Sequence, residues 1–372
     1  MNTTRTLCAV LTFLFLAFTL TGLIGCAAPR ETAPTPEGTE TVPEDPSEAE
    51  EANVMIPEET AAAAEEAEPA AVRFGYEHNA LLIDEGQCGD SVYWQFYEDG
   101  RLAVFGEGPM WDYKPTGRGK EVTAPWEVYK DGLASLELCE GVTSVGNYAF
   151  AACGGFTGSL TLPSTLKSIG NEAFSYCSGF TGSLTIPDGV EEIQASAFNK
   201  CTGIEGSLTL PSSLKKIGMM AFNRCTGFTG SLTIPDGTEE IGMWAFMECR
   251  GFAGELTIPD SVTDIGHGAF EECVGLSGNL TIGSGVKTIK DHAFSGCRGV
   301  TRVTVGEHVE KLESCAFQNC TALEDMYFYG SAPEMHHDAF LGSRQRIVIH
   351  YPAGGFGWTD PWNGFETEEF EP

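Results

Sequence analysis

Eight cysteines that recur at a nearly fixed spacing are the first side chains in this sequence that could do chemistry. Many cysteines in a chain that leaves the cytoplasm invite disulfides, and neighbouring repeats can bring Cα atoms within bonding range. One cysteine per repeat at an apolar position is more simply a small buried hydrophobe, so we expect free thiols. Cys88 and Cys139 lie outside the series and could pair. The series is Cys153, Cys177, Cys201, Cys225, Cys249, Cys273, Cys297 and Cys320.

The histidines form no spaced ligand set. His336 and His337 are adjacent, which predicts that their side chains diverge, so we expect surface histidines and no metal site. The sequence has no C-x-x-C pair, H-E-x-x-H motif, nucleophile elbow, Walker loop or convincing dinucleotide fingerprint. Acidic residues are plentiful, but no catalytic pair stands out from a solvated acidic surface. The sequence therefore predicts a protein that is not an enzyme and needs no cofactor.

A column of threonines is the second repeated chemical feature. We expect these side chains to face away from the core on successive strands, where strand propensity and hydroxyl pairing explain them. The alternative is a flat hydroxyl array that binds ice or a polysaccharide. Ice-binding solenoids usually carry two such columns, and only one is predicted here. The column is Thr161, Thr185, Thr209, Thr233, Thr257, Thr281 and Thr304.

The element that positions these residues is a repeat marked by nine Ala-Phe dipeptides. Six successive steps between the phenylalanines are 24 residues and the last two are 23. A fixed period of this size indicates a stack of similar units, each packed mainly on its neighbours. We expect the rings to stack into a continuous core. The phenylalanines are Phe150, Phe174, Phe198, Phe222, Phe246, Phe270, Phe294, Phe317 and Phe340.

One unit shows the expected local structure. The segment 184–186 alternates apolar and polar residues, which predicts a short half-buried strand that Pro187 ends. Val190 and Ile193 follow as inward apolar positions. Ala197, Phe198 and Cys201 then have the spacing of one helical turn. The predicted fold is a β-rich repeat solenoid with short helical turns, about nine coils of 23–24 residues, capped at both ends.

These motifs resemble the BspA-type leucine-rich repeats of bacterial surface proteins. The shared features are the strand-Pro element, the Ile-Gly pair (Ile217-Gly218, Ile241-Gly242) and the Ala-Phe-x-x-Cys turn, over residues 136–350. The resemblance implies a curved solenoid with a role in adhesion or protein binding at the cell surface. The Gly-Phe-Thr-Gly insert departs from the family pattern. The last two units also place Glu313 and His336 where glycine is expected, as terminal units often vary.

The residues before Ala-Phe vary from coil to coil and are candidates for partner binding. Met219, Met220, Met243 and Trp244 would form one apolar patch on adjacent coils, and Tyr148 occupies the same place in an earlier coil. Such a patch suits a protein or glycan partner. The alternative is that these side chains pack down over the coil edge.

The N-terminus carries processing signals. Residues 1–25 combine Arg5 with an apolar run, and Leu23-Ile24-Gly25-Cys26 resembles the bacterial lipobox. This resemblance implies cleavage after Gly25 and lipidation of Cys26. The alternative is an ordinary secretory signal with a chance cysteine. Residues 26–72 are rich in Pro, Glu, Ala and Thr, and we expect a disordered acidic linker. An extracytoplasmic protein, held on a bacterial membrane only by acyl chains, would result.

The remaining segments look like caps. Residues 73–135 contain a hairpin signal around Glu98-Asp99-Gly100, and residues 351–372 hold aromatic residues among acids. The tail could instead form an aromatic binding site. The net charge of −32 argues against a nucleic-acid partner. We therefore expect a non-enzymatic surface lipoprotein that binds an extracellular protein or glycan. A structural or ice- or polysaccharide-binding solenoid and an accessory part of an enzyme complex are the alternatives.

Overall fold

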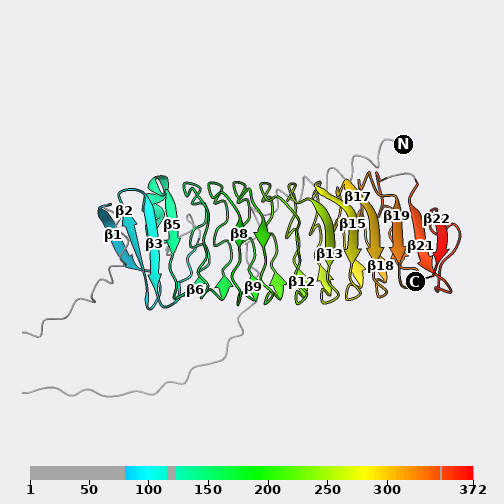
Figure 1. Cartoon of the computed structure of the whole chain (residues 1–372), viewed down its shortest axis with the longest axis horizontal. Coiled ribbons are helices and arrows are strands. Elements are labelled where there is room, and N and C mark those ends of the chain that lie inside the picture. Colours follow the sequence, from blue (N-terminus) through cyan, green and yellow to red (C-terminus); the bar gives the residue numbers. More distant parts are fainter. Residues whose placement is uncertain (1–79, 115–122, 344–345, 372) are drawn as a thin grey trace, which may run out of the picture. The chain divides into compact units, whose positions relative to one another are not determined.

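The computed structural model describes residues 80–114, 123–343 and 346–371, which form successive stacked coils (Figure 1). Cys26, the expected cleavage site and the linker over residues 26–72 lie outside the described residues. Our predictions for those segments therefore stay predictions.

A four-stranded sheet lies at the N-terminal end of the coils. The hairpin expected around Glu98-Asp99-Gly100 is confirmed, because β2 and β3 pair antiparallel on either side of it. The 3-10 helix η2 (Pro125–Gly132) follows and buries Trp126. Because the Trp126 ring stacks on Phe150 at 5.2 Å, this segment covers the first coil. The strands, in sheet order, are β1 (Leu82–Gln87), β2 (Val92–Tyr97), β3 (Arg101–Gly106) and β5 (Ser135–Leu138).

A line of parallel strands follows the predicted Leu-Thr positions, except around Leu160 and Leu232, where no strand forms, and it ends with a strand from the C-terminal tail. In register, Leu184 faces Leu208 and Thr185 faces Thr209. The leucines point inward and are buried, while the polar neighbours point outward, as strand alternation requires. These strands are β8 (Leu184–Thr185), β10 (Leu208–Thr209), β13 (Gly254–Ile258), β15 (Leu276–Ile282), β17 (Gly299–Val305), β19 (Asp325–Phe328), β21 (Val348–Pro352) and β22 (Glu366–Phe370).

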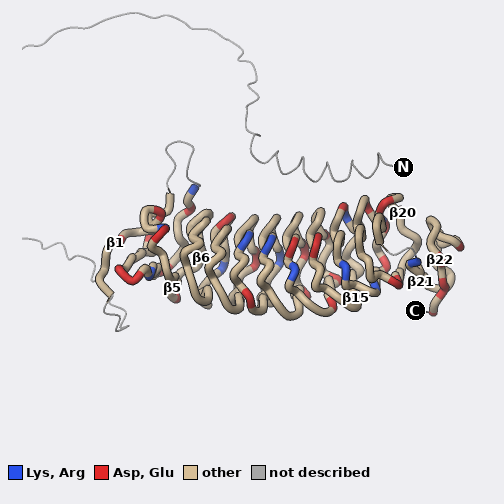
Figure 2. The backbone as a smooth tube through the Cα atoms, turned by 90° about the horizontal axis from the view of Figure 1, so that it is seen from above, with Lys and Arg blue, Asp and Glu red and all other residues tan. Residues whose placement is uncertain are grey.

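A second line of parallel strands was not predicted. Ile193, Ile217 and Ile241 lie in register on successive coils and are fully buried. The residue before each isoleucine is charged, and Lys216 forms a 2.9 Å ion pair with Glu240. Figure 2 shows how basic and acidic residues are spread along the coils. The strands are β4 (Gly108–Pro109), β6 (Val142–Val145), β7 (Ser168–Ile169), β9 (Glu192–Ile193), β11 (Lys216–Ile217), β12 (Glu240–Ile241), β14 (Asp264–Ile265), β16 (Thr288–Ile289), β18 (Lys311–Leu312) and β20 (Glu334–Met335).

The predicted helical turn around Ala-Phe is wrong. Ser196 and Lys200, on either side of Phe198, have left-handed φ values of 56° and 61°. These left-handed residues turn alternate peptide N–H groups toward the next coil, so the Phe198 N–H donates to the Ala221 carbonyl at 2.8 Å. An α-helical turn would instead direct these donors along its own axis to residues within the coil. Within the described residues, the only helix is therefore η2.

The phenylalanine column forms the expected continuous core. Successive rings from Phe150 to Phe340 stack at centroid distances of 5.3 to 5.6 Å, with nearly parallel planes. Every ring from Phe150 to Phe317 is fully buried. The last one, Phe340, is half-buried and meets Phe365 edge-on at 5.1 Å. The tail thus covers the C-terminal end of the column, while β22 extends the sheet beside β21.

The cysteine column consists of buried free thiols, as expected. Burial raises the pKa of Cys225 to about 12, so this thiol stays protonated and unreactive at neutral pH. The structure also gives the thiol a role that the sequence did not indicate. The Cys225 sulfur donates to the Phe198 carbonyl of the preceding coil at 3.0 Å. In the last coil Ser343 makes the equivalent bond to Phe317 at 2.6 Å. The column therefore requires a small hydrogen-bond donor.

Cys88 and Cys139 do not form the disulfide that we considered. Cys88 is fully buried and Cys139 is half-buried, and each has a free thiol. Burial raises the pKa of both thiols, that of Cys88 to about 12.

Replacing Phe222 with Ala should lower the free energy of unfolding by about 3–5 kcal/mol, because it leaves a ring-sized cavity in a closed column. Phe222→Leu should cost less, since it keeps most of the buried volume. Urea unfolding followed by circular dichroism measures both. Equal, small losses for the two variants would mean that the stacked rings do not hold the coils together.

Candidate functional site

The predicted apolar patch lies at the start of the Ala-Phe turn in two adjacent coils. We call Met219, Met220, Met243 and Trp244 the Met-Trp patch. Met219 is 42% exposed, and the other three side chains are half-buried. The Met220 peptide N–H donates to the Met243 carbonyl at 2.8 Å, which fixes the two coils against each other. The patch is therefore partly open to solvent and rests on a rigid backbone.

Trp244 owes its position to a glycine in the next coil. Gly268 holds the same left-handed turn position as Trp244 and Met220, with φ of 58°. A Cβ placed on Gly268 would lie 2.5 Å from Cδ1 of the Trp244 ring and 3.0 Å from the Glu271 carboxylate. The missing side chain thus leaves room for the indole to lie over the coil edge. Trp244 therefore packs over the coil edge and is at the same time partly exposed in the Met-Trp patch.

Tyr148 does not join the Met-Trp patch. It occupies the same turn position, but Glu172 and Ser196 fill that position in the two coils between Tyr148 and Met220. Burial, the charge of Glu172 and a hydrogen bond from the Tyr148 hydroxyl to Glu172 together raise the pKa of the tyrosine. Its role as a binding residue remains a separate proposal.

Glu271 gives the edge beside Trp244 a titratable group. Burial, together with the nearby carboxylates of Glu272 and Glu248, raises the pKa of this carboxyl to about 7. The acids beside it are neutralised in part, since Arg224 pairs with Glu248 at 2.9 Å and Arg298 pairs with Glu272 at 3.2 Å. Glu271 therefore changes charge near neutral pH.

The threonine column lies on the outer face of the Leu-Thr strands, as expected. Thr161, Thr185, Thr209, Thr233 and Thr257 are exposed, whereas Thr281 and Thr304 are half-buried.

The expectation of a single hydroxyl column is wrong. Serines two residues before the threonines form a second exposed column on the same face: Ser159, Ser183, Ser207 and Ser231. Ser183 and Ser207 are linked at 3.3 Å between their hydroxyl oxygens. The signal was present in the sequence, because Ser-Leu-Thr places both hydroxyls on one side of a strand. Toward the C-terminus the serine column gives way to Glu255, Asn279 and Arg302.

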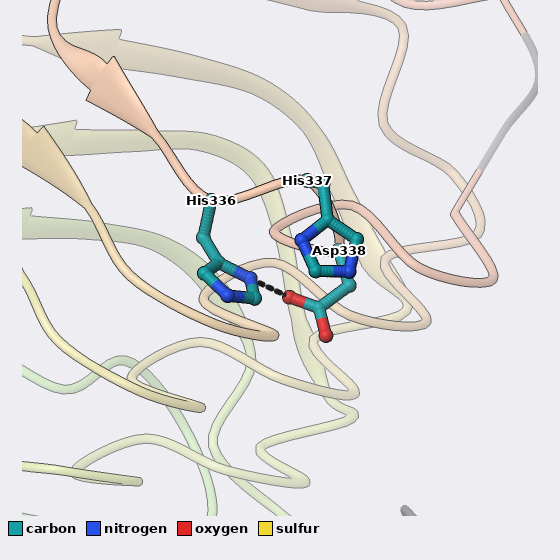
Figure 3. Close-up of side chains that lie close together, drawn as sticks. All are labelled: His336, His337 and Asp338. Carbon is teal, nitrogen blue, oxygen red and sulfur yellow. Dashed lines mark hydrogen bonds and ion pairs between the residues drawn. The ribbon is translucent and has the colours of Figure 1, made fainter. Parts of the chain in front are cut away.

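Several histidines gather on the same turn edge as the Met-Trp patch, in later coils. His267 lies 4.0 Å from Asp291, and the ring centroids of His336 and His337 are 4.4 Å apart. The expected divergence of the adjacent pair is therefore wrong, because the tight turn after β20 folds both rings toward Asp338 (Figure 3). The 24-residue spacing that places His267 and Asp291 in one column was the signal that could have revealed their contact.

The parallel strands, the inward leucines and isoleucines and the capped ends define a leucine-rich-repeat solenoid. The sequence pattern of the family described as BspA type leucine rich repeat region matches this chain in six copies, over residues 128–253 and 253–353. The chain belongs to this family.

Three solved bacterial structures are similar. A leucine rich cell surface protein of Faecalibacterium prausnitzii is 19% identical, with 73% of this chain and 94% of that one covered and a TM-score of 0.32. A leucine-rich repeat protein of Bacteroides ovatus is also 19% identical, with coverages of 77% and 100% and a TM-score of 0.33. The T. pallidum Leucine Rich Repeat protein is 25% identical, with coverages of 62% and 86% and a TM-score of 0.34. No functionally curated protein matches the chain.

At these TM-scores the similarities to solved structures carry no argument about function. The assignment of the chain to its family rests on the match to the repeat pattern. Among the residues that the structure describes, none belongs to a helix with the length and apolar character needed to span a bilayer.

Glu271→Gln should stabilise the protein at pH 8 and have little effect near pH 4.5. Between the unfolded pKa of 4.5 and the folded value of about 7, the folded state holds a proton that the unfolded state has lost. The free energy of unfolding therefore falls as pH rises through this window, by about 1–3 kcal/mol. Urea midpoints at both pH values measure the effect. The exposed Glu205→Gln is the control, and a pH-independent shift for Glu271→Gln would contradict the assignment.

Proposed function

We propose that this protein is a non-enzymatic, lipid-anchored surface protein of a bacterium, and that its solenoid binds an extracellular protein or glycan through the Met-Trp patch. The observation that carries the proposal is the exposure of Met219 beside Trp244 on a rigid, repeated edge. Repeat solenoids suit binding because adjacent coils offer many contact positions on one surface.

The composition around the patch supports this proposal. In a chain with a net charge of −32, the turn positions of three adjacent coils carry no charged side chain: Ala195-Ser196, Met219-Met220 and Met243-Trp244. Interface cores are depleted of charged residues and enriched in aromatic residues and Met. The alternating left-handed turns hold the backbone in place, so little conformational entropy is lost when a partner binds.

The anchor forms the second part of the proposal. The lipobox-like Leu23-Ile24-Gly25-Cys26 would leave Cys26 as a lipidated first residue. The acidic linker of residues 26–72 would then separate the solenoid from the membrane, with a reach of roughly 35–40 Å if it behaves as a flexible chain. The acyl chains would be the only membrane contact.

The two hydroxyl columns favour a second candidate function. Ser and Thr side chains alternate with inward leucines, so each of four successive coils presents two hydroxyls about 6–7 Å apart, and coils repeat about every 4.8 Å. The exposed part of this face, from Ser159 to Thr233, could order water at ice or bind a regular polysaccharide.

Met243→Ser/Trp244→Ser should weaken binding to the partner at least about tenfold, because it removes the aromatic anchor of the patch. The measurement is a binding screen of the full chain against extracellular proteins and glycans, with Kd values determined for each hit. Circular dichroism checks that the variant folds.

Thr209→Tyr/Thr233→Tyr is the reciprocal variant, since it disrupts the hydroxyl face and leaves the Met-Trp patch intact. It should not change binding through the patch, and it should abolish ice or polysaccharide binding. Binding that survives the Met243/Trp244 change but is lost in the threonine variant would replace the first candidate function with the second.

Cys26→Ser should prevent membrane attachment, because the hydroxyl cannot replace the thiol that accepts the lipid. The measurement is radiolabelled palmitate incorporation together with membrane fractionation in a bacterial host. Cys8→Ser, within the apolar run, is the matched control and should label normally. Equal labelling of both variants would overturn the lipid anchor while leaving the binding proposal intact.

A further inference from the structure

The last coil carries a group of metal-ligating side chains outside the Met-Trp patch and the hydroxyl face. His336 and His337 follow β20 directly, and Asp338 completes the group in the tight turn before Ala339-Phe340 (Figure 3). The ligand atoms of the three residues lie within 4.8 Å of one another. Both imidazoles are exposed, while Asp338 is half-buried.

We propose that His336, His337 and Asp338 bind a divalent transition-metal ion of the zinc class. Two imidazoles and one carboxylate suit an ion of the zinc class, whereas calcium and magnesium prefer donor sets made of oxygen atoms. Zinc bonds of about 2.0–2.2 Å need ligand atoms closer together than 4.8 Å, and rotation of the exposed histidine side chains provides that adjustment.

The backbone and the neighbouring coil hold this group in place. The His336 peptide N–H donates to the Leu312 carbonyl at 2.9 Å, and the Ala339 N–H donates to the His336 carbonyl at 3.0 Å. The His336 ring and the Asp338 carboxylate are hydrogen-bonded, and the Ser314 hydroxyl of the previous coil bonds the same carboxylate. Ser314 therefore orients the carboxylate from outside the ligand set, as outer partners do in metal sites, and a bound ion would replace the hydrogen bond between His336 and Asp338.

A hollow lies beside the group, on the side of His336. Its volume is about 370 Å³, and it is lined by Asp291, Lys311, Glu313, Ser314, Glu334 and His336. Three protein ligands leave one position of a tetrahedral zinc ion open for a water or a partner's side chain.

A second group of similar spacing is less suited to zinc. His267, Asp291 and Glu313 come from three coils, but they offer only one imidazole. Glu313 is also paired with Lys311 at 3.2 Å, so a cation already neutralises this carboxylate. The experiment therefore treats this group as the internal comparison.

The test is calorimetric titration of the full chain, purified in detergent, with ZnCl₂ at pH 7.5. The His336→Ala/His337→Ala variant should bind Zn²⁺ at least tenfold more weakly than the natural chain. Asp338→Asn should weaken binding while preserving the shape of the group. His308→Ala removes an exposed imidazole elsewhere and should bind Zn²⁺ like the natural chain, as should His267→Ala/Asp291→Asn.

Absorption spectra with Co²⁺ in place of Zn²⁺ give an independent readout, because bands of a four-coordinate ion should appear in the natural chain and vanish in His336→Ala/His337→Ala. Circular dichroism should show the same fold for all variants, since the two histidines are exposed. Three results would each overturn the proposal: no Zn²⁺ binding by the natural chain, undiminished binding by His336→Ala/His337→Ala, or tenfold weaker binding only in His267→Ala/Asp291→Asn.

Discussion

The hydrogen bonding between Ala-Phe turns is the constraint on which the rest of the structure depends. In the coils from Phe150 to Phe317, left-handed residues such as Ser196 and Lys200 turn alternate N–H groups toward the next coil. Non-glycine residues rarely adopt this conformation, so the intercoil bonds and the buried ring must stabilise it. Once it is set, each phenylalanine lies over the one before, and the cysteine thiol can reach the carbonyl of the previous coil.

The same constraint explains where this chain can vary. Gly242 must lack a side chain because a Cβ would lie 2.6 Å from the backbone of the preceding coil. The positions just after it point outward and accept Met243, His267 or Asp291 without disturbing the column. In other coils the glycine itself is replaced, by Gln194 and Lys290 within the solenoid and by Glu313 and His336 at the C-terminal end. Chemical variety therefore collects along one edge of the turn, whereas the core repeats unchanged.

The two faces of the solenoid offer different kinds of surface. The turn edge carries single, distinctive side chains, so it can recognise a partner through a few contacts. The outer strand face repeats Ser and Thr at the coil spacing, so it can match only a ligand that is itself periodic. Neither of the two proposed binding roles needs a catalytic group.

The sequence by itself determined the solenoid, its period and the buried cysteine column, because each depends on residues that recur every 23–24 positions. The capped ends were predicted from the flanking segments, in which the repeat is absent. The sequence could not determine the conformation of the Ala-Phe turn, since Phe198 and Cys201 have helical spacing and the left-handed residues beside them are not glycines. Nor did it reveal which side chains meet across coils. The separation of Tyr148 from the Met-Trp patch, the room that Gly268 makes for Trp244, and the approach of His336 to His337 follow from turn geometry. Only the tertiary structure decides these contacts, because they depend on the register between coils and on the direction of each Cα–Cβ bond.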